Sequence, residues 1–180
     1  MQTIPFEAML AFQREEAAAI LVEALSLVPS AWRDMPSARA EVAKFVDNPD
    51  RLAIAGVEGE RLLGWIGGIR HSRHAWELHP LVVDPAHQRM GYGRLLVREL
   101  EDKARAEKVC TIWLGVDDDF GGTNLFGADL YPDVLERLLR LAPTGKHPYT
   151  FYRRLGYAVV GVLPDVDGLG KHDILMAKRL

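Results

Sequence analysis

The amino-acid sequence predicts an α/β (α+β) fold, a single domain with a mixed central sheet of about six to seven strands flanked by helices. Three observations support this prediction. Stretches with helical and strand periodicity follow one another along the chain, without internal repeats. The 180 residues are 48% hydrophobic and 26% charged, which is ordinary for one soluble core. A turn with two glycines joins a strand pattern to an amphipathic helix near the middle of the chain.

The first 50 residues are expected to form an N-terminal strand and helices. Residues 13–28 carry apolar side chains at helical spacing, and Pro29 is expected to end that helix because proline has no backbone N–H to donate. Ser37 can cap a second helix over residues 38–46, since its hydroxyl can accept a hydrogen bond from a free backbone N–H. Nothing in this part of the sequence indicates a function.

A β-hairpin and a third strand are expected next. Residues 52–57 and 62–69 are strand-like, and the segment 58–60 (Glu-Gly-Glu) between them suits a tight turn. Residues 76–83 (Trp-Glu-Leu-His-Pro-Leu-Val-Val) form the third strand. Successive side chains of a strand point to opposite faces. The predicted members of one face of this strand are Glu77, His79, Leu81 and Val83.

A glycine-containing turn follows the third strand and opens a helix that runs to about residue 108. Such a turn collects free backbone N–H groups at the positive end of a helix dipole, where phosphate binds. A dinucleotide fingerprint would need a third glycine where Leu96 stands, and a Walker A loop would need Gly-Lys-Ser/Thr, which is absent. The alternative is a turn that only starts the helix. The residues expected at the phosphate-bearing ligand are Gln88, Arg89, Met90, Gly91, Tyr92, Gly93 and Arg94.

Further elements complete the predicted order. The sequence predicts a buried strand over residues 109–116, a short helix over 134–141, and strands over 157–162 and 173–178. The stretch 117–147 is expected to be an acidic insertion.

Two motifs resemble the GNAT superfamily of N-acetyltransferases. Residues 88–93 (Gln-x-x-Gly-x-Gly) resemble the loop that binds the pyrophosphate of acyl-CoA in that superfamily. Residues 151–157 (Phe-Tyr-x-x-x-Gly-Tyr) resemble its later Phe-Tyr motif. The superfamily often has Asn six residues and Ala three residues before the Phe, and this chain has Gly145 and Pro148 there. The resemblance therefore does not imply the cofactor contacts of that Asn for this chain, although the Phe-Tyr pair is present.

The resemblance implies one acetyltransferase domain over residues 1–180, with acetyl-CoA as co-substrate. Residues 76–108 would supply the acyl-CoA loop and its helix, and residues 148–180 the C-terminal motif. Tyr152 would contact the cofactor and protonate the departing thiolate, unless it is only a buried tyrosine with its hydroxyl bonded elsewhere. The resemblance also implies that strand N–H groups hold the pantetheine arm and polarise the thioester carbonyl. The residues in that place are Leu81, Val82 and Val83.

Amine acetylation needs a base, because an ammonium must lose a proton before its nitrogen can attack a thioester. Glu77 lies 11 residues before Gln88, which is the spacing of the catalytic glutamate in the superfamily's histone acetyltransferases. Glu77 is therefore the first candidate base, and the alternative is a carboxylate that binds substrate or faces solvent. His79 is the second candidate, and the alternative is a histidine packed in the fold.

An acidic segment suggests a cationic acceptor. Residues 117–136 contain six acidic residues and no basic residue, with aromatic residues between them. Such a surface attracts polycations by charge and by ring stacking. The candidate substrate-binding residues are Asp117, Asp118 and Asp119. A solvated insertion and a divalent-cation site are the alternatives, but the spacing Asp-x-Asp-x-Asp-Gly of a calcium loop is absent.

Longer stretches narrow the resemblance. Residues 63–68, 76–83, 113–118 and 171–178 together resemble bacterial aminoglycoside 6′-N-acetyltransferases, over roughly residues 60–180. This resemblance implies a primary amine of an aminoglycoside as the acceptor, and a role in antibiotic resistance. An acetyltransferase for peptide, protein or polyamine amines is one alternative. A non-catalytic acyl-CoA-binding domain is the other.

Composition limits other functions. Cys110 is the single cysteine, so no intramolecular disulfide can form, and it is expected in the core. The formal net charge of −3 argues against nucleic-acid binding. Without a run of ~18 apolar residues or a signal segment, no membrane contact and a cytoplasmic location are expected. No zinc motif is present, so no metal is expected. Leucine- and valine-rich strands leave homodimerisation open.

Overall fold

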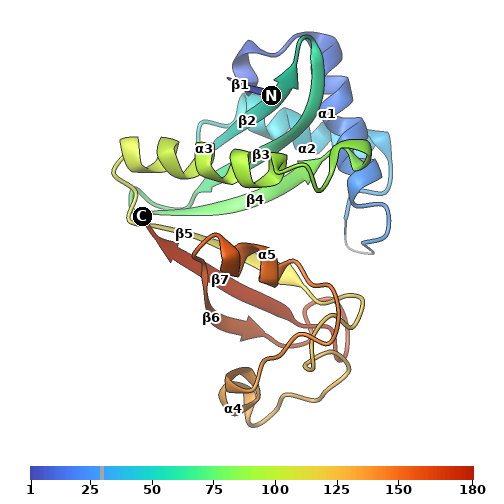
Figure 1. The fold of residues 1–180 in the computed structure, drawn as a ribbon, viewed down its shortest axis with the longest axis vertical. Coiled ribbons are helices and arrows are strands. Elements are labelled where there is room, and N and C mark those ends of the chain that lie inside the picture. Colours follow the sequence, from blue (N-terminus) through green and yellow to red (C-terminus); the bar gives the residue numbers. More distant parts are fainter. Residues whose placement is uncertain (29–30) are drawn as a thin grey trace. The chain divides into compact units, whose positions relative to one another are not determined.

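The computed structural model describes residues 1–28 and 31–180, which divide into two compact units. The first unit comprises residues 1–112 with Leu180, and the second comprises residues 113–179. Over the described residues the chain forms seven strands and five α-helices, which confirms the predicted α/β class (Figure 1). None of the described helices is long and apolar enough to cross a membrane.

The first unit contains four antiparallel strands that are adjacent in chain order. The β2–β3 hairpin and the strand after it are confirmed, and the N-terminal strand pairs with the outer side of the hairpin. The strands are β1 (Gln2–Pro5), β2 (Arg51–Glu58), β3 (Arg61–Arg70) and β4 (Ala75–Val83).

Helices cover both faces of these strands. Figure 1 shows α3 (Tyr92–Ala106) across one face, and α1 (Ala11–Ala24) and α2 (Met35–Asp47) together on the other. Two neighbouring glycines of β3 mark the faces. A Cβ atom on Gly67 would meet the ring of Phe45 in α2, whereas one on Gly68 would meet Leu100 in α3. We call these the α2 face and the α3 face of the strands.

The ends of the helices differ from the predictions for local reasons. α1 ends at Ala24, before the predicted end, and Pro29 lies outside the described residues. α2 begins three residues early because Asp34, and not Ser37, is its N-cap. The Asp34 Oδ1 atom accepts a hydrogen bond of 2.8 Å from the Ser37 N–H. α3 begins at Tyr92, directly after Gly91.

A β-bulge interrupts β4. The register of β3 against β4 shifts between Ile66 and Gly68, so that two residues of β4, His79 and Pro80, lie opposite the single residue Gly67. One extra residue in a strand reverses the alternation of side chains beyond it. Odd-numbered side chains of β4 therefore lie on one face before the bulge and on the opposite face after it.

The bulge corrects the prediction that four side chains of β4 share one face. Glu77 lies opposite Ile69, which packs in the α2-face core, and His79 is on the same face. Beyond the bulge, Leu81 lies opposite Ile66 on the α3 face, and Val83 follows the same parity. Glu77 and His79 therefore share the α2 face, but Leu81 and Val83 do not.

The second unit contains β5 (Thr111–Asp117), within which the boundary between the units falls, and two later strands. β7 (Asp173–Arg179) lies between β5 and β6 (Ala158–Leu163) and is antiparallel to β6, so both predicted final strands are confirmed. α4 (Val134–Leu139) packs beside β6, and α5 (Tyr149–Arg154) beside β7. A small core in this unit contains Leu125, Leu130 and Val162.

The expectation of a core thiol at Cys110 is wrong. Cys110 is exposed because β5 begins only at Thr111, and the preceding residues still belong to the connection from α3. The Cys110 Sγ atom lies 3.7 Å from Nδ1 of His74, in the connection before β4.

Candidate functional site

The turn between β4 and α3 has the geometry of an anion site. Arg89 and Gly91 have left-handed backbones, with φ of 67° and 93°. The Leu95 N–H donates to the Gly91 carbonyl at 3.1 Å, so the N–H groups of residues 92–94 precede the first helical hydrogen bond and have no acceptor within the helix. Gln88, Arg89, Met90, Gly91 and Arg94 are exposed. Both N–H groups and guanidinium groups are thus accessible to a phosphate.

Asp84 holds the start of this turn. Its Oδ1 accepts from the Ala86 N–H at 2.9 Å, and its Oδ2 lies 3.0 Å from both Arg61 Nη2 and His87 Nδ1. Burial acts to raise the pKa of Asp84, but these hydrogen bonds and the nearby positive charge outweigh it and hold the pKa below its ordinary value. Gln88 Nε2 donates to the Val83 carbonyl at 3.2 Å, which ties the turn back to β4.

Gly91→Val is expected to weaken acetyl-CoA binding about tenfold, or about 1.4 kcal/mol. A β-branched residue at φ of 93° strains the backbone that presents the helix N–H groups. Isothermal titration calorimetry measures the change. Gly59→Val is the matched control, because Gly59 also has positive φ (60°), and a Cβ at either glycine meets no atom within 4 Å. Equal affinity losses in both variants would refute a specific role of the turn.

The two candidate bases lie on the α2 face of β4, two residues apart. The Glu77 side chain is 21% exposed, and its Oε2 lies 2.6 Å from Nε2 of His71. The ring centroid of His79 is 5.5 Å from that of Trp32, which precedes α2. Burial lowers the pKa of His79, although the carboxylates of Glu77 and Glu41 act in the opposite direction. His79 is therefore neutral at pH 7 and can accept a proton.

The backbone after the bulge alternates in direction. The Asp84 N–H donates to the Leu63 carbonyl in β3 at 2.8 Å. Because the backbone groups of successive strand residues point to opposite sides, those of Val82 also point toward β3, and those of Leu81 and Val83 point away from it. Of the three predicted backbone donors, Val82 therefore pairs within the sheet, while Leu81 and Val83 face away from β3.

Tyr152 lies on α5 in the second unit and is 8% exposed. Its ring centroid lies 5.0 Å from that of Phe151 and 5.7 Å from that of Tyr157. Burial raises the pKa of the Tyr152 hydroxyl above its ordinary value. The phenol consequently stays protonated at neutral pH, which is the state in which it can donate a proton.

The three consecutive aspartates have different surroundings, all within the second unit. Asp118 is 2% exposed and accepts hydrogen bonds from the Gly122 N–H (2.8 Å), the Thr123 N–H (3.0 Å) and the Thr123 hydroxyl (2.6 Å). Its carboxylate therefore holds the loop together. Asp119 is also buried, and its Oδ1 lies 3.2 Å from Lys171 Nζ.

Asp117 is the exposed member of the three. Desolvation of its carboxyl group and the neighbouring carboxylates of Asp173, Asp167 and Asp119 raise the pKa of Asp117 to about 7. Clustered carboxylates of this kind are favourable places for a positive charge. Within residues 1–28 and 31–180, no group of three or more His, Cys, Asp and Glu side chains is arranged to hold a metal ion.

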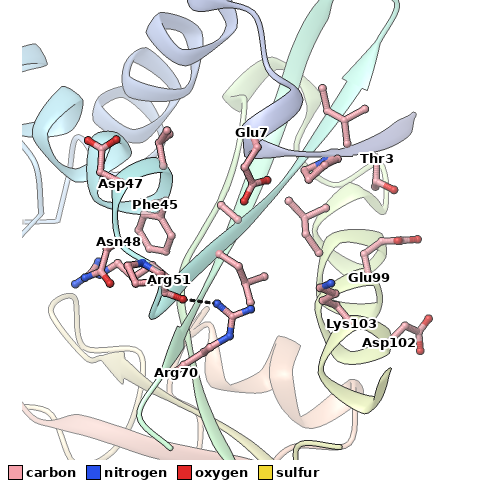
Figure 2. Close-up of a pocket in the computed structure, with 17 residues that line it drawn as sticks. Thr3, Glu7, Phe45, Asp47, Asn48, Arg51, Arg70, Glu99, Asp102 and Lys103 are labelled. Carbon is pink, nitrogen blue, oxygen red and sulfur yellow. Dashed lines mark hydrogen bonds between the residues drawn. The ribbon is translucent and has the colours of Figure 1, made fainter. Parts of the chain in front are cut away.

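A cavity of about 680 Å³ in the first unit does not coincide with the predicted site. Figure 2 shows it between the end of α2, strand β2 and the side of α3, and none of the predicted site residues lines it. Arg70 at its edge donates from Nη1 to the Pro49 carbonyl at 2.7 Å.

Two residues beside the candidate bases, Trp32 and His71, belong to no motif in the sequence. Trp32 stands in the segment between the first two helices, and His71 stands in the connection between β3 and β4. The one sequence feature that could indicate a role for Trp32 is that a large aromatic residue stands in a connection between two helices. Residues six apart lie about 20 Å from each other in a strand and do not share a face in a helix, so neither period predicts a contact between His71 and Glu77.

Comparison with known proteins gives consistent results. A family model described as "Acetyltransferase (GNAT) family" matches residues 16–126. An aminoglycoside 6′-N-acetyltransferase complexed with coenzyme A is 35% identical, with a TM-score of 0.89, and the match covers 99% of this chain and 97% of that one. The aminoglycoside 6′-N-acetyltransferase from Enterococcus faecium is 36% identical at the same coverage, with a TM-score of 0.88. An aminoglycoside 6′-acetyltransferase type Ii is 31% identical, also at this coverage, with a TM-score of 0.73. A search of curated proteins finds no match.

Proposed function

Because the chain belongs to the GNAT family of acetyltransferases and is an acetyl-CoA-dependent N-acetyltransferase, we propose that it acetylates the 6′-amine of an aminoglycoside. One observation carries the choice of acceptor. The aminoglycoside acetyltransferases resemble this chain over nearly its whole length, and their identity is well above the level at which only a fold is shared.

The proposed cofactor contacts lie in the turn between β4 and α3 and at the end of β4. The N–H groups of residues 92–94, with Arg89 and Arg94, would hold the pyrophosphate, which fits their exposure and the left-handed Gly91. The N–H groups of Leu81 and Val83 would hold the pantetheine arm and polarise the thioester carbonyl. Acetyl-CoA supplies the activated acyl group.

The proposed proton transfers use two side chains. Glu77 takes a proton from the acceptor ammonium, directly or through water, and leaves a neutral amine that can attack the thioester. Tyr152 donates its phenolic proton to the departing thiolate, a role that its protonated state supports. His79 is the alternative base, since it is neutral and shares the α2 face of β4 with Glu77.

The proposed acceptor contact in the second unit is Asp117. Its exposure and the three carboxylates around it favour a ligand ammonium group. Asp118 and Asp119 support this contact indirectly, Asp118 through the loop bonds and Asp119 through Lys171.

A raised pKa of Asp117 predicts that kanamycin binds more tightly as the pH rises through about 7. The carboxyl group is neutral below that pH and attracts a cation only above it. For a partly solvated pair we expect about threefold tighter binding at pH 8 than at pH 6. Isothermal titration calorimetry of wild type and Asp117→Asn isolates this contribution, since only the wild type should show it. A pH dependence that is identical in the two proteins would exclude Asp117.

The proposed reaction is tested by free-thiol release from acetyl-CoA with a panel of kanamycin, spermidine and a lysine-containing peptide. Rapid release with kanamycin, and acetylation at its 6′-amine by mass spectrometry and NMR, would support the proposal. Preference for spermidine or the peptide would replace the acceptor with a polyamine or a protein amine. Binding of acetyl-CoA without thiol release for any of the three would exclude them all as acceptors and sink the proposed acceptor class.

The proposed reaction would also have a consequence for the cell. We propose that residues 1–180 act as one acetyltransferase domain in the cytoplasm, where acetyl-CoA is available, and that the product confers antibiotic resistance. Expression in a susceptible bacterium should then raise the inhibitory concentration of kanamycin.

A further inference from the structure

The shortest side-chain contact of Glu77 is made with a residue outside β4. Nε2 of His71 lies 2.6 Å from Oε2 of Glu77, which is a hydrogen-bond distance. The two side chains differ in exposure, 48% for His71 and 21% for Glu77. The histidine thus connects a half-buried carboxylate to solvent.

The backbone that carries His71 is fixed on both sides. The His71 and Ser72 N–H groups both donate to the Ala75 carbonyl at 3.2 Å, and Ser72 Oγ accepts from the Ala75 N–H at 3.1 Å. Arg70, directly before His71, donates to the Pro49 carbonyl (dashed in Figure 2) and lies over the Trp76 ring, 5.1 Å from its centroid. The connection is therefore a tight, hydrogen-bonded turn that holds the imidazole in place.

We propose that His71 is a positioning residue for the base Glu77. This inference rests on the proposed function. The Nε2–H group of His71 donates to Oε2 of Glu77, which fixes the carboxylate and leaves Oε1 to accept the ammonium proton. After transfer Glu77 is a neutral carboxylic acid, the amine carries the lone pair that attacks the thioester, and no other group changes its charge. A carboxylate with one oxygen held by a donor presents its other oxygen in a fixed direction, which makes it a preorganised base.

Other charged groups lie near His71. Asp50, Arg70, Arg73 and Glu107 line a cavity of about 420 Å³ together with His71. Arg70, the residue directly before His71, forms an ion pair with Glu107, with its Nη2 atom 3.3 Å from the carboxylate. His79 is the titratable neighbour of Glu77 on β4. The test therefore uses a double-mutant cycle, which cancels contributions that both variants share.

His71→Ala is expected to lower kcat for thiol release about tenfold, with KM for acetyl-CoA unchanged, because the base loses its orientation. His71→Gln, whose amide N–H can replace Nε2–H, should recover most of this loss. If His71 acts through Glu77, then His71→Ala should cost nothing further in a Glu77→Gln background. His74→Ala is the matched control, since His74 is on the same connection but contacts Cys110, and it should keep wild-type kcat.

Three outcomes would overturn the inference. One is an unchanged kcat in His71→Ala, and another is an equal loss from His71→Ala in both backgrounds. A third comes from imidazole NMR, which needs no turnover. Glu77→Gln should shift the His71 ring resonances and leave those of His74 in place, and an unshifted His71 would mean that the contact is not formed. If wild type releases no thiol although His71 shifts, the contact stands, and the proposed function and the role of His71 within it fail.

Discussion

Tyr152→Phe is expected to lower kcat for acetyl transfer about 100-fold and to leave KM for acetyl-CoA nearly unchanged. The substitution keeps the ring packing against Phe151 and Tyr157 but removes the hydroxyl that would protonate the departing thiolate. Steady-state thiol release measures kcat, and thermal unfolding shows that the fold is kept. Burial keeps the Tyr152 hydroxyl protonated at neutral pH, so it has a proton to donate. The loss of kcat in the Phe variant therefore measures what that proton contributes.

The same helix offers a matched control. Tyr149 is 1% exposed, and within the described part of the chain its hydroxyl has no hydrogen-bond partner. Tyr149→Phe should therefore keep wild-type kcat and should not lower stability, because a buried hydroxyl without a partner contributes only a desolvation cost. If Tyr149→Phe and Tyr152→Phe reduced kcat alike, the loss would reflect α5 as a whole, and Tyr152 would not be the acid.

Gly67→Ala is expected to lower the free energy of unfolding by about 3 kcal/mol. A methyl group there would collide with the His79 carbonyl oxygen and the Phe45 ring, and the carbonyl belongs to the bulge itself. Chemical denaturation monitored by tryptophan fluorescence measures the change. Activity per folded molecule should also fall, because a shift at the bulge reorients the N–H groups of Leu81 and Val83.

Gly68→Ala is the control for Gly67→Ala. The nearest obstacle there is Cδ1 of Leu100 at 2.9 Å, the far end of a flexible side chain. A leucine can rotate away, so the cost should be about 1 kcal/mol, without loss of activity per folded molecule. Equal destabilisation by the two substitutions would mean that both faces of β3 are equally crowded, and the bulge would have no special sensitivity.

Local patterns predicted the strands and the turn well, because their signals lie within short windows. The β2–β3 hairpin follows from two apolar runs around Gly59, and α3 follows from the glycine turn. The bulge could not be predicted in this way. The alternation Glu77, His79, Leu81, Val83 is unbroken in sequence, and the extra residue becomes visible only through the register with β3.

The sequence predicted the parts of the candidate site in which a motif determines the backbone conformation. It did not predict the parts that depend on which hydrogen bonds a side chain makes. The left-handed Gly91 follows from its place in the turn. By contrast, Asp118 looked like its neighbours in sequence, but its burial against Gly122 and Thr123 gives it a loop-holding role. The His71–Glu77 contact depends on how tightly one connection folds, which composition does not specify.

The bulge in β4 also bears on how new specificities could arise. Before it, Glu77 and His79 face α2, and the His79 ring lies beside Trp32. Beyond it the backbone leads into the turn that Asp84 holds. Odd-numbered side chains face α2 in the first stretch and α3 in the second, so the two sets pack against different helices. If the proposed base Glu77 receives the amine on this face, substitutions around Trp32 should change which amine is accepted and leave the turn at residues 84–94 unchanged. A laboratory lineage selected on different amines should accumulate changes on the first stretch and leave residues 84–94 untouched.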